Sequence, residues 1–144
     1  PVSISYEFDP NDLLKAKELH SADLNSEYIK ERDEDLKSIA NGITGFKGNV
    51  NINLSKPMRF DDEDNYQTVS NKITNSIVSM YELHATNFAA CNLMGINLPK
   101  QSKYTEEEIK QAQKKLEDRL YGEEKGVCSK LLEQYANPVL RKLK

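Results

Sequence analysis

The side chains best suited to chemistry in this chain are four consecutive carboxylates, Asp61, Asp62, Glu63 and Asp64. Carboxylate oxygens bind hard cations, but a calcium loop alternates its ligands and contains a glycine, and this run has neither feature. The run precedes a segment that we predict to be helical, where negative charge in the first turn is favoured by the helix dipole. We interpret the four carboxylates as the start of that helix and as a candidate surface for a basic partner, with a metal site as the remaining alternative.

The histidines and cysteines do not combine into a catalytic or metal-binding pattern. His84 lies seven residues before Cys91, which is roughly 10 Å along a helix, so the two side chains cannot touch. We predict that His84 lies at the edge of the core and is hydrogen-bonded to a neighbour, with a pH-sensitive switch as the alternative. Cys91 and Cys128 lack the spacing of a zinc site, and we predict two reduced thiols, with a disulfide or metal pair as the less favoured option.

Common catalytic and nucleotide-binding motifs are missing. No serine stands in a Gly-x-Ser-x-Gly setting, and the glycines at 42, 45 and 48 precede a predicted strand, which is the wrong order for a phosphate-binding loop. The Glu-x-x-His pattern of di-iron bundles is absent, since Lys17 and Tyr81 occupy the positions three before the two histidines. We therefore predict no catalytic residue and no cofactor.

Pro1 leaves one enzymatic alternative open. A prolyl amine at the head of a strand, followed by a helix and a second strand, resembles the tautomerase superfamily, in which an N-terminal proline acts as general base. The resemblance covers this one residue and the β-α-β order of residues 1–55, and it implies an enzyme in which Pro1 is the base. The second half of the chain departs from that family, because we predict it to be helical where the family supplies further strands.

Length and charge limit the classes of function. The chain has 144 residues and a formal net charge of −3 at pH 7, which fits a single globular domain over 1–144 and lacks the concentrated positive field of a nucleic-acid-binding protein. Weak nucleic-acid binding through the basic tail stays a second alternative, through Lys130, Arg141, Lys142 and Lys144. The longest apolar stretch, 88–94, is too short to cross a bilayer, and no signal-peptide pattern is present, so we expect a soluble cytoplasmic protein that does not bind membranes.

Two segments have the alternation of strands, at about 2–8 and 49–55. Apolar side chains occupy every second position of the first, and asparagine alternates with aliphatic residues in the second. We predict that the asparagines face water and that the aliphatic side chains face the interior, namely Val2, Ile4, Val50 and Ile52. The long helical crossover between the strands allows them to be parallel.

The rest of the chain has helical periodicity. Apolar residues recur at three- and four-residue steps from Tyr66 to Cys91, which predicts a central helix over about 62–94 whose second half is the core. A helical segment from 10 to 41 should break near 20–26, a capping box at Thr105 and Glu108 should start another helix, and a short final helix should end before Pro138. The predicted fold is α+β and predominantly helical, with four or five helices around the central one, a small two-stranded sheet, and a core that includes Ile73, Ile77, Phe88, Leu116 and Leu132.

These patterns favour a protein–protein interaction module over an enzyme. An intracellular accessory, inhibitor or immunity-type factor would fit a compact helical frame with acidic surface patches, of which the run 61–64 is the most concentrated. Such a patch would attract a protein with a basic surface and accelerate its association. The sequence specifies neither the oligomeric state nor the identity of that protein.

Overall fold

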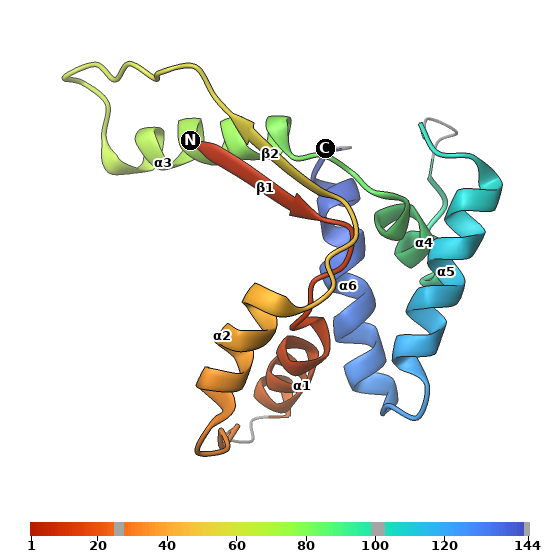
Figure 1. Cartoon of the computed structure of the whole chain (residues 1–144). Coiled ribbons are helices and arrows are strands. Elements are labelled where there is room, and N and C mark those ends of the chain that lie inside the picture. Colours follow the sequence, from red (N-terminus) through yellow and green to blue (C-terminus); the bar gives the residue numbers. More distant parts are fainter. Residues whose placement is uncertain (25–27, 99–102, 143–144) are drawn as a thin grey trace.

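The chain folds into a group of packed helices with a small sheet at one side. The computed structural model describes residues 1–24, 28–98 and 103–142 (Figure 1). In these ranges it has six helices and a two-stranded sheet, so the α+β, predominantly helical class is confirmed. The elements in chain order are β1 (Val2–Tyr6), α1 (Asp12–Asp23), α2 (Glu34–Thr44), β2 (Val50–Leu54), α3 (Tyr66–Met80), α4 (Ala85–Leu93), α5 (Glu106–Leu120) and α6 (Lys125–Lys142).

The core lies where α4, α5, α6 and α1 meet. Helix α4 packs against both α5 and α6, and α6 also packs along α1. Alanines at 85, 89 and 90 let the neighbouring helices approach α4 closely, and Cys91 completes its buried side. Larger buried side chains come from the other elements: Phe8, Leu116, Leu131, Tyr135 and Val139. The prediction that residues near 85–91 form the core is confirmed, whereas of the five predicted core residues only Leu116 is fully buried and the other four are half-buried.

A buried ion pair joins α1 to α5 and α6. The Asp12 carboxylate is 1% exposed, and its oxygens lie 2.8 and 2.7 Å from Arg119 Nη1. The Tyr135 hydroxyl donates to the same carboxylate at 2.6 Å and accepts a hydrogen bond from the Asp9 N–H. Burial and the neighbouring Asp12 charge raise the pKa of Tyr135, so its hydroxyl keeps the proton that it donates. Each charged and polar group of this network is thus paired, as buried charge requires.

The predicted helix over about 62–94 is two helices, and the structure corrects both its start and its continuity. Helix α3 begins at Tyr66, where the Asn65 side chain accepts the N–H of Thr68, so residues 61–64 precede the first turn. Residues 81–84 are not helical, and α4 starts after His84, whose N–H donates to the Asn87 side chain at 2.7 Å. Apolar spacing continues across the break because both helices turn apolar sides inward, so periodicity alone could not show it.

Two further boundaries differ from the prediction. Helix α1 ends at Asp23, within the predicted break, but α2 starts only at Glu34, and residues 25–27 lie outside the described ranges. Helix α6 continues through Pro138 to Lys142. Proline removes one backbone hydrogen bond there, but Val139 just beyond it is buried, so packing holds the last turn in place.

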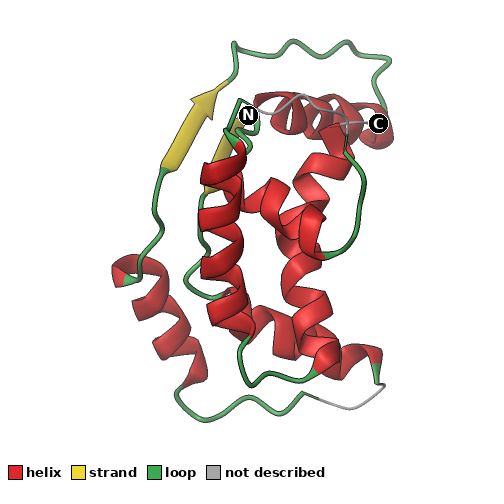
Figure 2. Cartoon of the chain, turned by 90° about the vertical axis from the view of Figure 1, so that its right-hand side faces the viewer, coloured by secondary structure: helices red, strands yellow, loops and turns green. Residues whose placement is uncertain are grey.

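The sheet is antiparallel, in contrast to the parallel pairing that the crossover allowed. Val2 pairs with Leu54, Ile4 with Ile52, and Tyr6 with Val50. Figure 2 shows β2 and α2 along one side of the molecule, away from the helices of the core. No helix in the described ranges is long and apolar enough to cross a membrane.

Candidate interaction surface

The outer face of the sheet is apolar and lies in water, which overturns the predicted register of its two faces. Ser3 and Ser5 are buried, whereas the aliphatic residues on the opposite face are between 43% and 76% exposed: Val2, Ile4, Val50, Ile52 and Leu54. Alternation correctly identified which side chains share a face, but the serine side and not the aliphatic side packs on the protein. The result is a row of apolar cross-strand pairs, Val2 with Leu54 and Ile4 with Ile52 followed by Val50 opposite Tyr6, whose aliphatic side chains are exposed.

Hydrogen bonds explain why the polar face of the sheet turns inward. The Asn53 side chain donates to the carbonyl of Met80 at 2.8 Å, at the end of α3. His84 Nε2 lies 3.3 Å from Ser5 Oγ, and the Thr86 hydroxyl donates to the carbonyl of Glu7 at 2.7 Å. These partners sit on α3, α4 and the segment between them, so the sheet is fixed to the core through polar contacts. The aliphatic side of the sheet consequently faces water.

Helix α2 presents a second apolar area. Its side chains at 36, 39 and 43 recur at helical spacing, and Leu36, Ile39 and Ile43 are 61–75% exposed. No residue of α2 is buried, and α2 makes no extensive contact with any other described helix or strand. Its attachments are few: the Asn11 side chain donates to the carbonyl of Ser38 at 3.0 Å, and the Phe46 ring, just after the helix, lies 5.8 Å from that of Phe8.

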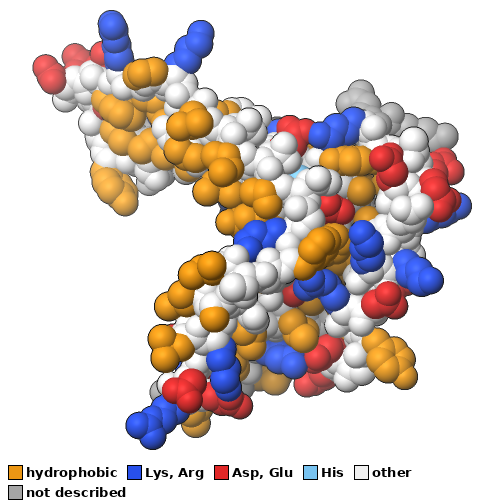
Figure 3. Space-filling view, viewed as in Figure 1, with side chains coloured by type: hydrophobic (Ala, Val, Ile, Leu, Met, Phe, Trp, Pro, Cys, Tyr) orange, Lys and Arg blue, Asp and Glu red, His pale blue; other side chains and the backbone are white. Residues whose placement is uncertain are grey.

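The sheet face and the α2 stripe lie on the same side of the molecule. Figure 3 shows apolar side chains above and below a hollow between the sheet and α2. We call these two areas together the apolar face and define it by eight residues: Val2, Ile4, Leu36, Ile39, Ile43, Val50, Ile52 and Leu54. At roughly 100 Å² for a fully exposed aliphatic side chain, the apolar face leaves on the order of 500 Å² of apolar area in water. The largest apolar patch of a monomeric protein is typically about 300–600 Å² and is often functional, which makes the apolar face a candidate place of contact with another molecule.

The acidic run predicted as a partner surface lies in the loop between β2 and α3. Asp61, Asp62 and Glu63 are exposed, whereas the Asp64 carboxylate lies 2.6 Å from Lys72 Nζ and accepts the N–H of Asp61. The hydrogen bond from Lys72 lowers the pKa of Asp64. Since Asn65 caps α3, the run does not form its first turn, and three of its four carboxylates remain unpaired in the described part of the chain.

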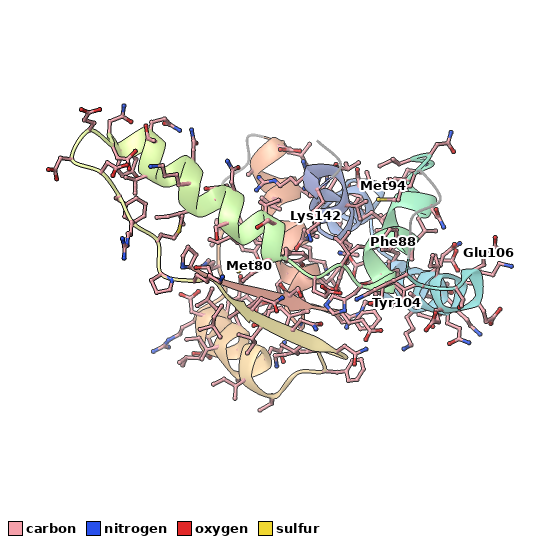
Figure 4. The ribbon with its side chains drawn as sticks, turned by 90° about the horizontal axis from the view of Figure 1, so that it is seen from above. Met80, Phe88, Met94, Tyr104, Glu106 and Lys142 are labelled. Atoms are coloured by element: carbon pink, nitrogen blue, oxygen red, sulfur yellow. The ribbon has the colours of Figure 1, made fainter. Side chains whose placement is uncertain are left out.

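His84 is 2% exposed and faces Ser5 and a cavity of about 130 Å³. Burial lowers its pKa, which keeps the ring neutral. Tyr104 closes one side of the cavity, where its hydroxyl donates to the carbonyl of Leu83 and its ring lies 6.2 Å from Phe88 (Figure 4). The cavity is smaller than a typical ligand pocket of about 300–1,000 Å³. The prediction that His84 is hydrogen-bonded to a neighbour is confirmed, since Ser5 is that neighbour. The side chain is more deeply buried than the predicted position at the core edge.

Several residues of the two alternative functions already contact other parts of the chain. Pro1 is half-buried just before β1, and its carbonyl accepts the N–H of Ser55. Lys130 forms an ion pair with Asp23 at 2.6 Å, and Lys142 donates to the carbonyl of Ser79 in α3 (Figure 4). Arg141 is exposed, and Lys144 lies outside the described residues. Pro1 does not line the cavity beside His84, and two of the four residues of the predicted basic tail are engaged within the chain.

Comparison with family models, with curated proteins and with solved structures finds no match for this chain. The interpretation of the apolar face therefore depends on its own composition and geometry. Sequence patterns predicted that four residues of the face point into the interior, Val2, Ile4, Val50 and Ile52, and the structure shows all four in water. The missed signal was the alternation of small polar residues with the aliphatic ones in the strands, because Ser5 and Asn53 form hydrogen bonds on a buried face and such residues also suit a wet one.

Proposed function

We propose that this chain is a protein–protein interaction module and that its binding surface is the apolar face. The observation that carries the proposal is α2, an amphipathic helix whose apolar stripe is covered by nothing in the described chain. A helix of 11 residues is marginal by its own propensity and normally depends on packing of its apolar side. A protein that packs on α2 and on the adjacent sheet face supplies that packing.

The composition of the face indicates how binding would be driven. Neither strand contains a charged residue, and the exposed side chains are aliphatic, so association depends on removing apolar area from water. The apolar part of one side of a standard interface is roughly 500 Å², because such an interface buries about 800 Å² per partner and is about 60% apolar. The apolar face is of this size, which fits specific association and exceeds what isolated surface aliphatics provide.

The acidic run contributes a second, weaker element to the same proposal. Asp61, Asp62 and Glu63 project from the loop that follows β2, at the end of the arm formed by the sheet and α3 (Figure 1). Charges at the rim of an interface mainly change the rate of encounter. A partner with basic residues at the corresponding position would associate faster, and neutralising these carboxylates would slow association more than it speeds dissociation.

The proposal is tested by comparative affinity capture from the native host. Four baits are used: the wild-type chain, Ile39→Glu in α2, Ile52→Glu in β2, and Asn41→Glu as the matched control. Asn41 is exposed on α2 and lies two residues from Ile39, which places it on the opposite side of the helix. Proteins that bind the wild type and Asn41→Glu, and that are lost from both apolar-face variants, are the expected result. The same proteins on all four baits would contradict the proposal.

A further inference from the structure

The apolar face has two halves, the sheet and α2, and each is the kind of surface on which the other normally packs. A two-stranded sheet is marginal unless its apolar face packs on a helix or another sheet, and an amphipathic helix requires an apolar surface for its stripe. The sheet offers an aliphatic surface and α2 offers an apolar stripe, yet within one chain the two make no extensive contact. Each half is therefore a suitable cover for the other.

The connection between α2 and β2 keeps the two halves of one chain apart. The N–H of Phe8 donates to the carbonyl of Lys47 and that of Glu7 donates to the carbonyl of Asn49, both at 2.9 Å. These bonds fix the segment 45–49 between α2 and β2, and the Phe46 ring packs on Phe8. With these contacts in place, α2 makes no extensive contact with its own sheet. The α2 stripe is therefore available to another molecule.

The charge around α2 permits a second copy of the chain to approach. Residues 28–50 carry four basic side chains, Lys30, Arg32, Lys37 and Lys47, against four acidic ones, Glu31, Asp33, Glu34 and Asp35, so this region has no net charge. Two ion pairs, Lys30 with Asp35 and Lys37 with Glu31, balance charge locally. The α2 half of the apolar face therefore does not repel a second copy of itself, and the acidic run lies outside this region, in the loop after β2.

From these observations, and resting on the proposed function above, we propose that the occupant of the apolar face is a second copy of this chain. In the two-fold dimer, α2 of each copy packs on the outer sheet face of the other, across the hollow between them (Figure 3). A two-fold axis makes both contacts at once, because the same patch serves on both copies. Such an interface has an aliphatic centre, and interfaces between identical subunits are more apolar than other interfaces, at about 65% of their area.

The test measures the mass of the full chain by light scattering during size-exclusion chromatography, at roughly 100 μM, above the micromolar limit expected for an interface of this size. The wild type and Asn41→Glu should have twice the 16.4 kDa mass of one chain. Ile39→Glu and Ile52→Glu should each be monomeric, with dimerisation at least about 100-fold weaker, because each places an unpaired charge in the interface. Unchanged far-UV circular dichroism shows that the variants are folded.

A mixing experiment tests the reciprocal arrangement. Ile39→Glu keeps an intact sheet face and Ile52→Glu keeps an intact α2, so a mixed pair retains one of the two contacts. Analytical ultracentrifugation of the equimolar mixture should show association at least about tenfold tighter than either variant alone. If Ile39→Glu stays dimeric while Ile52→Glu does not, the sheets pack on each other and the reciprocal arrangement is wrong. A monomeric wild type overturns the second-copy inference, whereas the proposed function still stands if the capture experiment returns a different protein that depends on the face.

Discussion

The region around α4 and the region of α2 and the sheet follow equally clear apolar patterns but differ in what covers them. The alanines of α4 are enclosed by α5 and α6, and α6 is covered in turn by α1. The aliphatic residues of α2 and the outer sheet face are covered by nothing in the described chain. An apolar pattern shows which side chains share a side of an element, and the cover can come from the same chain or from another. The two regions should therefore respond differently to the same kind of substitution.

The largest effect should come from Asp12, which lies in the covered region. Asp12→Ala removes the carboxylate that pairs with Arg119 and accepts the Tyr135 hydroxyl, and it leaves both groups without their partner. We expect a loss of about 3–5 kcal/mol in the free energy of unfolding, measured by urea denaturation. Asp33→Ala, an exposed carboxylate before α2 whose side chain caps nothing, is the control and should change stability by less than about 0.5 kcal/mol. Equal losses would show that Asp12 is not a structural contact.

A pair of leucines compares the two regions directly. Leu116→Ala empties a fully buried site in α5 and should cost about 2–5 kcal/mol through lost burial and a cavity. Leu36→Ala on α2 should cost less than about 0.5 kcal/mol when measured in the Ile52→Glu background, where the proposed dimer does not form. In the wild-type background Leu36→Ala should instead weaken dimerisation. A large loss for Leu36→Ala in the monomeric background would mean that α2 packs on its own chain.

The sequence predicts local features of the fold well, as the two ends of α5 show. The capping box at the start of α5 is present, since Thr105 accepts the N–H of Glu108 and the Glu108 carboxylate accepts the N–H of Thr105. Gly122 follows the end of α5 with a φ of 79°, a conformation that favours glycine and that a sequence can signal by the glycine itself. These features depend on residues within one turn of each other, so the sequence contains the whole interaction.

Sequence reasoning failed where the deciding interaction is distant. The burial of Ser5 depends on His84, and the inward turn of Asn53 depends on the carbonyl of Met80, so neither can be seen in the alternation of the strands. The same holds for the break between α3 and α4, which the Asn87 side chain stabilises by bonding to both His84 and the carbonyl of Tyr135. The aliphatic side of the sheet was consequently assigned to the interior. Its exposure follows from long-range polar contacts that fix the opposite side of the sheet.

His84 lies at the junction of the two regions, because it precedes α4 and contacts Ser5 of β1. Burial lowers its pKa in the folded protein, and the nearby Lys103 acts in the same direction, while the hydrogen bond with Ser5 and the charges of Glu7 and Glu82 oppose the shift. The ordinary pKa of histidine is about 6.5. Below that value the unfolded chain takes up a proton that the folded chain does not, so the stability that the neutral ring allows is present above pH 6.5 and is lost as the pH falls towards the lowered pKa.

We therefore expect the smallest of the three effects to appear between pH 7.5 and 5.5. The free energy of unfolding from urea denaturation should fall on acidification, with the contribution of His84 no steeper than about 1.4 kcal/mol per pH unit. His84→Gln keeps a polar side chain without the titration and should lose less stability over the same interval, so the difference between the two proteins isolates His84 from His20. Identical losses of stability in the wild type and His84→Gln would show that the His84 ring is protonated in the folded protein without cost. In that case the His84 ring would reach water in the folded protein, and its contact with Ser5 would open more readily than its burial indicates. The sheet would then be held to the core less firmly than the helices of the core are held to one another.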